Sequence, residues 1–312
     1  MSDYAALLIT AFNRPRQLEE LLRSLTEFHC KIYVSLDVAK KDDFENEVLV
    51  NECKLVIDNF SSYITELRIS PSNQGCFRGV SNAISWGFTK ESRLIILEDD
   101  IRIGEAFLIF ASQMLQEYED TYTIGSIAGT NYVPNEFVTN TNHPFRLSAF
   151  TSSWGWATWS DRWKDYEVDL LNFPTMQYRY PENFWSFARK RYWKRIFNRT
   201  AEGVYDAWDY RWLYSNWIHN RLTIVPGSNL VTNVGFGQGA THTKNDVPPS
   251  WVPSKINESY RAGPSPSEIT RDLLADSWIE RNHLGISLLK QLKSELSFKY
   301  PKFASVYRNF LK

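Results

Sequence analysis

The chain has few cysteines, no long apolar run and almost no net charge, and each shortage excludes a class of protein. Its three cysteines are Cys30, Cys53 and Cys76, and their spacing offers neither a CxxC zinc pair nor a disulfide framework. No stretch of eighteen apolar residues occurs. The first residues do not show the succession of basic, apolar and small residues that is typical of a signal peptide. With 35 basic and 36 acidic side chains, no global field attracts nucleic acid. We therefore expect a cytoplasmic protein without a nucleic-acid partner.

Two common phosphate motifs are also missing. The chain contains neither the glycine fingerprint GxGxxG of dinucleotide sites nor the phosphate loop GxxxxGK[ST]. It has no internal repeat and no long low-complexity tract. A nucleotide, if one binds, must be held by other means.

The first 132 residues alternate between buried-strand and helical patterns. The expected elements are strand 5–11, a helix with Leu18, Leu21, Leu22 and Leu25 on one face, strand 32–36, helix 45–60, strand 67–70, a helix opened by 73–84, strand 93–97, helix 105–118 and strand 123–131. Such alternation predicts right-handed crossovers and an α/β fold with a mixed, mainly parallel sheet covered by helices on both faces.

After residue 132 the periodicities weaken and aromatic residues accumulate. The chain has 12 tryptophans, which crowd between Trp154 and Trp217. Residues 134–181 are rich in Trp, Pro and Asn and predict an irregular part of the same globule, followed by a basic aromatic helix at 183–197. A Pro-rich loop at 247–253 precedes a predicted C-terminal helix pair. The predicted organisation is therefore 1–132, 133–245 and 246–312.

Three consecutive carboxylates follow the apolar strand at 93–97. Ligands of open α/β sheets bind beyond the carboxyl ends of the strands, where Glu98, Asp99 and Asp100 lie. Mg²⁺ and Mn²⁺ prefer oxygen ligands, and in phosphate chemistry one or two carboxylates and the substrate's phosphates share the ion. The triplet thus predicts a divalent-cation site for a nucleotide diphosphate. A solvated acidic turn that caps the next helix is the alternative.

Four features occur in an order that resembles a known family. They are a strand that ends in Asp37, the Glu98-Asp99-Asp100 triplet, the turn Ser153-Trp154-Gly155-Trp156-Ala157 with Trp208-Asp209-Tyr210-Arg211-Trp212, and the terminal Phe236-Gly237-Gln238-Gly239-Ala240-Thr241-His242. Over residues 5–245 this layout is similar to GT-A nucleotide-sugar glycosyltransferases, in particular the N-acetylglucosaminyltransferase I family. Residues 73–82 look more like bacterial family-two glycosyltransferases. The resemblance implies the GT-A, Rossmann-like form of the α/β fold.

The resemblance also implies roles for individual residues. Asp37 would pair with the uracil of UDP, Glu98 and Asp99 would face ribose and donor sugar, and Asp100 would touch Mn²⁺ or Mg²⁺. The remaining donor-binding candidates are Thr10, Asn13, Arg14, Asn73, Gly75, Arg78 and His242, and His242 is also a metal candidate. The terminal loop is shorter than in the family, which weakens the match of His242.

A catalytic base is expected in the Trp208–Trp212 segment. The family carries Trp-Asp-Asp-Trp there, whereas this chain has Tyr210 in place of the second Asp and an additional Arg211. Asp209 takes the role by position, and Asp206, three residues earlier, is the alternative. One base opposite the diphosphate implies direct displacement with inversion at the anomeric carbon. A helix-start residue among core tryptophans is the plainer interpretation of Asp209.

Large aromatic rings stack on sugars, which makes Trp154, Gly155, Trp156 and Trp208 candidates for acceptor binding, although core packing explains such residues equally well. The basic aromatic stretch 189–195 favours either a lipid-linked acceptor at the inner face of a membrane or a solvated helix face.

The expected function is transfer of a sugar, N-acetylglucosamine or another hexose, from a UDP-sugar to a glycan or glycolipid hydroxyl in bacterial surface polysaccharide synthesis. Two alternatives come from other classes. A sugar-nucleotide nucleotidyltransferase would need a glycine-rich loop after the first strand, where residues 10–15 have no glycine. A non-catalytic carbohydrate-binding protein would explain the tryptophans but not the acidic triplet.

Overall fold

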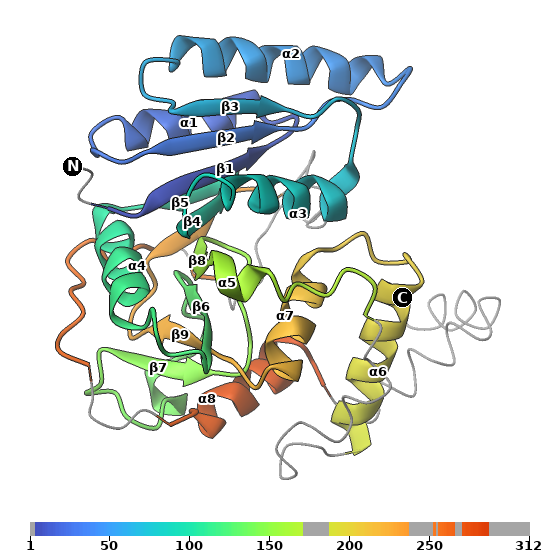
Figure 1. Ribbon diagram of the computed structural model, residues 1–312. Helices are drawn as coiled ribbons and strands as arrows, with labels where there is room; N and C mark the ends of the chain where they lie inside the picture. The colour runs from blue at the N-terminus through green and yellow to red at the C-terminus, as the bar shows by residue number, and fades with distance from the viewer. Residues whose placement is uncertain (1–3, 171–186, 237–251, 254, 266–269, 287–312) are drawn as a thin grey trace, which may run out of the picture.

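The computed structural model describes residues 4–170, 187–236, 252–253, 255–265 and 270–286. A large mixed sheet dominates it (Figure 1). The strands of this sheet are β1 (Ala6–Ala11), β2 (Ile32–Leu36), β3 (Glu66–Ile69), β4 (Arg93–Glu98), β6 (Ile124–Ala128), β7 (Phe145–Ser148), β8 (Trp156–Trp159) and β9 (Leu222–Pro226). Within the described part of the chain they lie in the order β3-β2-β1-β4-β8-β6-β9-β7.

The sheet is parallel on one side and mixed on the other. β3, β2, β1 and β4 pair in parallel, as does β6 with β9. β8 runs antiparallel between β4 and β6, and β7 runs antiparallel to β9 at the edge. The predicted α/β fold with a mixed, mainly parallel sheet is therefore confirmed.

Helices cover both faces of the sheet. They are α1 (Pro15–Leu25), α2 (Phe44–Asn59), α3 (Gly75–Gly87), α4 (Glu105–Glu117), α5 (Ser160–Trp163), α6 (Phe187–Ala201), α7 (Asp209–Ile218) and α8 (Leu273–Trp278), with a short turn of 3-10 helix η1 (Asn135–Phe137) and a π-helical turn η4 (Ile279–His283). On α1 the four leucines expected on one face are the buried ones.

Alternation along β1 shows how the two layers form. Leu7 and Ile9 point into the core with α1, α2 and α4, whereas Ala6 and Leu8 point into the opposite core with α3 and the tryptophans of β8, α5 and α7. Both faces of the sheet are covered and excluded from water, which explains why the central strands are continuously apolar. The polar residues of this part of the chain therefore lie at the ends of the strands, as Asp37 does after β2.

The segment expected to be irregular, 134–181, contains two strands of the sheet. β7 and β8 are wholly buried, and β8 contacts both neighbouring strands. Because β8 lies between β4 and β6, residues on both sides of the expected boundary at 132 build one sheet. Residues 171–186, which include the start of the predicted basic helix, lie outside the described part.

A small second sheet pairs β5 (Ile101–Ile103) with β10 (Val231–Asn233) in antiparallel fashion. It places Asn233 beside the acidic triplet, since the backbone N–H of Val234 donates to the carbonyl of Asp100 at 2.9 Å. None of the helices that the structure describes is both long and apolar enough to span a membrane.

Of the expected C-terminal helix pair, α8 and the turn η4 fall within the described residues, and 287–312 lie outside them.

Candidate active site

A cavity of about 880 Å³ opens at the carboxyl ends of β1, β2, β3 and β4. Its walls bring together most of the residues that the sequence singled out, namely Thr10, Asn13, Arg14, Asp37, Asn73, Gly75, Glu98, Asp99, Asp100, Trp154, Trp208 and Asp209. These residues are up to about 200 positions apart in sequence, and the parallel strands explain the convergence, because such strands all end at one edge. The cavity is the candidate active site.

Asp37 is held by the loop that leads into α3. Both of its carboxylate oxygens accept from the backbone N–H of Gln74, at 3.2 and 3.0 Å, and the amide of Asn73 donates to Oδ2 at 3.5 Å. Asn73 also donates to the carbonyl of Val38 at 2.7 Å. This loop fixes the orientation of Asp37, and the carboxylate keeps further lone pairs for a donor in the cavity.

The acidic triplet is organised around Arg14. Its Nη1 lies 2.8 Å from Asp99 Oδ1 and 2.9 Å from Asp100 Oδ2, and both carboxylates are almost fully buried. The backbone N–H of Phe12 adds a bond to Asp99 Oδ2 at 3.2 Å. Burial lowers the pKa of the Arg14 guanidinium, but the contacts with Asp99 and Asp100 outweigh it and leave that pKa raised. Arg14 is thus a permanent charge within the cluster.

One guanidinium does not balance three carboxylates. Burial, with Asp100 and Asp99 as neighbours, raises the pKa of Glu98 to about 8, and burial with Asp99 raises that of Asp100 to about 6. If all three ionise, the cluster carries three negative charges against the one positive charge of Arg14, a surplus of two. Burial is the larger cause of the two raised pKa values, and the surplus of negative charge adds to it.

The donor set fits a hard divalent cation that shares its ligands with a substrate. Among the described residues, no group of three His, Cys, Asp or Glu side chains is arranged to hold a metal ion without further ligands. The carboxylates of Asp100 and its neighbours are oxygen ligands, and phosphate oxygens complete the coordination shell in many Mg²⁺ sites. Asn233 Nδ2 donates to Asp100 Oδ1 at a long 3.4 Å, which leaves this oxygen lone pairs for an ion.

Asp209 enters the cavity as the first residue of α7. The preceding loop is fixed by buried Arg211, whose guanidinium donates to the carbonyls of Ala207 at 2.8 Å and Thr200 at 2.7 Å. An acidic side chain in the first turn is favoured by the helix dipole. Asp209 and Glu98 both line the cavity, and the charge of Asp209 is the smallest of the named causes that raise the pKa of Glu98.

Asp206 has a different role. Its Oδ2 and Oδ1 accept from the backbone N–H groups of Cys76 at 3.1 Å and Phe77 at 3.0 Å, in the first turn of α3. Gly75, at φ +71°, leaves room for this carboxylate, because an added Cβ would lie 2.9 Å from Asp206 Oδ2. Asp206 therefore occupies the amino terminus of α3 beside Gly75, which the sequence had suggested for donor binding.

Comparisons with known proteins give weak likenesses. No family model and no curated protein matches the sequence. Among solved structures, the chain is similar to S. aureus TarS 1–349 (12% identity, 73% of this chain and 59% of that chain, TM-score 0.41). It is also similar to GalNAc-T7 with UDP, GalNAc and Mn²⁺ (10%, 72% and 42%, TM-score 0.41). A third is mannose-1-phosphate geranyltransferase from Thermus thermophilus (11%, 72% and 73%, TM-score 0.35).

The chain thus spans less than two thirds of the length of the first two structures. Likenesses this low assign neither a family nor an activity, and the site must be interpreted from its own geometry.

Three predicted site residues do not line the cavity, and a fourth, His242, lies outside the described residues. Trp156 is fully buried and stacks on Trp208, with ring centroids 5.2 Å apart, so its indole fills the core and the acceptor role predicted for it is wrong. Gly155, at φ +58°, makes room for Val231 rather than for a sugar, since an added Cβ would lie 2.8 Å from Val231 Cγ1. Arg78 is exposed on α3 and does not line the cavity.

The basic stretch of α6 is only partly a surface patch. Tyr192 and Trp193 are buried in a core with α7, and Arg189 pairs with Glu280. The rings that were expected to interleave with the basic charges at a membrane surface are therefore unavailable for it, and Lys190 and Lys194 remain exposed.

Glu98 predicts a pH-dependent stability. Its raised pKa means that the folded protein holds a proton which the unfolded chain has already lost, so the unfolding free energy falls as pH rises from about 4.5 towards 8. We expect Glu98→Gln to be more stable than the wild type by up to about 5 kcal/mol at pH 8.5 and to match it at pH 4.5. Urea denaturation of both proteins at the two pH values measures this difference. If the difference in unfolding free energy between variant and wild type is the same at both pH values, Glu98 stays ionised in the folded protein.

Proposed function

We propose that the protein is a glycosyltransferase of the GT-A type, which moves a sugar from a UDP-sugar to a hydroxyl of a glycan or lipid-linked acceptor. The observation that carries the proposal is the convergence of Asp37, the acidic triplet and Asp209 on one cavity at the carboxyl edge of the sheet. These groups correspond to the three tasks of such a transfer, which are binding the nucleotide, holding the diphosphate and activating the acceptor.

The nucleotide end of the site is formed by Asp37 and its loop. The carboxylate of Asp37, fixed by Gln74, would accept a hydrogen bond from the N3–H of uracil. Asn13 lies on the same wall, and its amide donates to Asn46 Oδ1 at 2.6 Å. We assign UDP as the nucleotide on the expected contact between Asp37 and uracil, together with the family resemblance of Asp37.

The acidic triplet and Arg14 form the diphosphate end of the site. Asp100, with Asp99 beside it, would hold Mn²⁺ or Mg²⁺, and the ion would neutralise charge that develops on the departing diphosphate. Arg14 keeps both carboxylates in place at 2.8 and 2.9 Å. The surplus of negative charge in the cluster disfavours a diphosphate in the absence of a cation, which makes metal dependence the expected behaviour.

Asp209 would act as the general base. A carboxylate positioned at the acceptor hydroxyl takes its proton as the hydroxyl attacks the anomeric carbon, and the sugar is transferred with inversion. Asp206 is less suited to the role, because both of its oxygens are engaged by the N–H groups of α3.

The finer assignments rest on the family resemblance. They are N-acetylglucosamine or another hexose as the donor sugar, bacterial surface polysaccharide synthesis as the pathway, and the cytoplasm or the inner face of the membrane as the location.

A thermal-shift panel tests the proposed function. UDP, GDP, dTDP and their common sugar conjugates are each added with Mn²⁺ or with EDTA. A ligand at one hundred times its Kd stabilises by about 2.7 kcal/mol, which corresponds to a rise in Tm of about 5 °C for a chain of this size. We expect this rise for UDP and UDP-sugars with Mn²⁺, and a smaller one with EDTA. Equal, negligible shifts for all nucleotides would overturn the proposal.

A further inference from the structure

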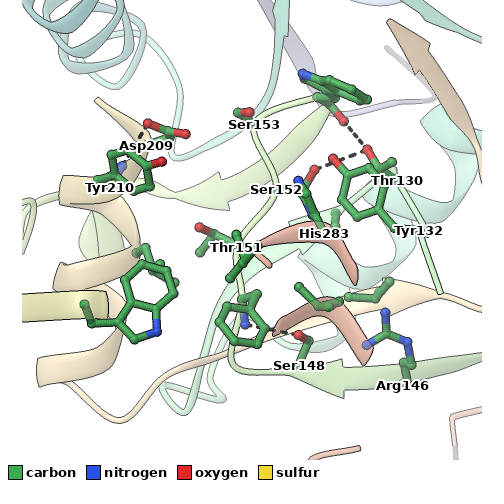
Figure 2. Close-up of a pocket in the computed structure, with 18 residues that line it drawn as sticks. Thr130, Tyr132, Arg146, Ser148, Thr151, Ser152, Ser153, Asp209, Tyr210 and His283 are labelled. Carbon is green, nitrogen blue, oxygen red and sulfur yellow. Dashed lines mark hydrogen bonds between the residues drawn. The ribbon is translucent and has the colours of Figure 1, made fainter. Parts of the chain in front are cut away.

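A second, smaller cavity of about 190 Å³ adjoins the candidate active site. Ser153, Trp154, Asp209 and Tyr210 line both cavities, so the smaller one continues from the catalytic carboxylate into the protein. Figure 2 shows Asp209 and Tyr210 on the α7 side of this side cavity, and Arg146 and His283 across from them. The side cavity is much smaller than a typical cofactor pocket and has room for a single ring-sized group.

Arg146 is the unusual residue of the side cavity. It lies on β7 and is only 7% exposed. Its Nη2 has one long contact, 3.5 Å from Asn131 Oδ1, while Nε and Nη1 have no hydrogen-bond partner in the described part of the chain. A buried guanidinium stays charged, and leaving its donors unsatisfied is costly.

The nearby carboxylates do not satisfy Arg146. Asp276 lies close enough to act on Arg146 through its charge, as does Asp272. The oxygens of Asp276, however, are engaged by Arg271 Nε at 2.6 Å, Ser148 Oγ at 2.5 Å and the backbone N–H of Ala149 at 3.0 Å. These carboxylates therefore reduce the cost of burying the charge but leave its N–H groups available to a ligand in the cavity.

The other polar groups of the side cavity suit the hydroxyls of a sugar. Ser152 Oγ donates to Thr130 Oγ1 at 3.2 Å, and Thr130 Oγ1 donates to the carbonyl of Trp154 at 2.9 Å (Figure 2). The His283 ring lies against Tyr132, with centroids 4.9 Å apart, and burial lowers its pKa to about 4. A neutral imidazole offers one donor and one acceptor.

We propose that the side cavity binds an acidic sugar unit, with its carboxylate on Arg146 and its hydroxyls near Thr130, Ser152 and His283. The proposal rests on the proposed function, because it names the substrate class of the same site. A single carboxylate balances the single buried guanidinium, whereas a doubly charged phosphate would leave negative charge beside Asp209 and Asp276. The acidic sugar is either the sugar of the donor or a unit of the acceptor.

Two binding experiments with the wild type distinguish these sources. In the donor arm, calorimetry compares UDP-glucuronate with UDP-glucose in the presence of Mn²⁺. In the acceptor arm, methyl glucuronoside is compared with methyl glucoside in the presence of UDP and Mn²⁺. We expect a preference of at least about tenfold for the acidic ligand in one arm, as charge-assisted hydrogen bonds to a buried Arg provide. That arm identifies the source.

Arg146→Met then tests the residue. We expect the variant to lose most of the preference, to below about threefold, and to bind UDP alone as tightly as the wild type. Arg146→Lys, which keeps the charge, should retain part of it. Arg93→Met is the matched control, because Arg93 lies at the amino end of β4, away from both cavities. It should leave every affinity unchanged.

The possible failures are distinguishable. A wild type that binds neither UDP nor any UDP-sugar overturns the proposed function itself. A wild type that binds UDP but shows no preference for the acidic ligand in either arm overturns only the role of the side cavity, and so does a preference that survives in Arg146→Met. If that variant does not fold, as judged by circular dichroism, the wild-type preferences together with Arg146→Lys decide.

Discussion

Replacing Asp209 by Asn should lower kcat by about 10² to 10⁴ and leave the affinity for UDP with Mn²⁺ close to that of the wild type. A positioned general base contributes a factor of this size, and an amide cannot accept the acceptor's proton. Asn keeps an oxygen for the bond from the backbone N–H of Tyr210, which Asp209 Oδ1 accepts at 2.9 Å, so the start of α7 should be preserved. Single-turnover transfer rates, with calorimetry for UDP, measure the two effects separately.

Asp206→Asn is the matched control, since Asp206 lies in the loop three residues before Asp209 and differs from it in what it contacts. Loss of the charged cap on α3 should lower the unfolding free energy by about 1 kcal/mol and change kcat by less than about threefold. If the catalytic loss appears in Asp206→Asn and not in Asp209→Asn, the base is Asp206 and the cap is rearranged when substrate binds.

The amino-terminal part of the fold was predictable because its signals are local. The strand at 32–36 was predicted with its observed bounds, and the four leucines of α1 were predicted as its buried face. Long apolar strands, helix-start residues and 3.6-residue spacing each report on their own segment. They require no knowledge of which strands pair.

The strands after residue 132 could not be recognised in the same way. β8 has the sequence Trp156-Ala157-Thr158-Trp159, which is buried on both faces and shows no alternation of polar and apolar residues. It enters the sheet between β4 and β6, far from its place in the chain order. Aromatic residues that resembled part of an irregular segment fill a core instead, since Trp156 and Trp163 pack with Trp212. Whether such a segment is irregular or a buried strand is decided by its pairing with strands that are distant in sequence.

The site residues also separate into those that follow predictable strands and those that do not. Asp37, Glu98, Asp99 and Asp100 follow predictable strands, so their convergence at one edge could be expected. Arg146 could not be identified, because an Arg on a short unpredicted strand carries no sequence signal for burial. Trp156 was misassigned because a tryptophan that stacks on a sugar and one that stacks on Trp208 look alike in sequence.

Arg14→Gln should give the largest loss of stability. The guanidinium lies between Asp99 and Asp100 at 2.8 and 2.9 Å, and both carboxylates are nearly inaccessible to water. Removing one partner of such a buried pair leaves uncompensated charge and typically costs about 3–5 kcal/mol. We expect a loss of this size in urea denaturation at pH 7.5 with EDTA. Because Asp100 carries a raised pKa of about 6, protonation should make the loss smaller at pH 5.

Mn²⁺ should restore part of the stability of Arg14→Gln, since a divalent cation among the same carboxylates would replace the missing positive charge. The ion should therefore raise the Tm of the variant more than that of the wild type, and UDP should increase the difference. Arg16→Gln provides the control, because Arg16 lies two residues after Arg14 in α1, is 87% exposed and should change stability by no more than about 0.5 kcal/mol. If the variant loses stability but its Tm does not respond to Mn²⁺, with or without UDP, the metal has no part in the proposed mechanism. Arg14 would then be the cation of the site.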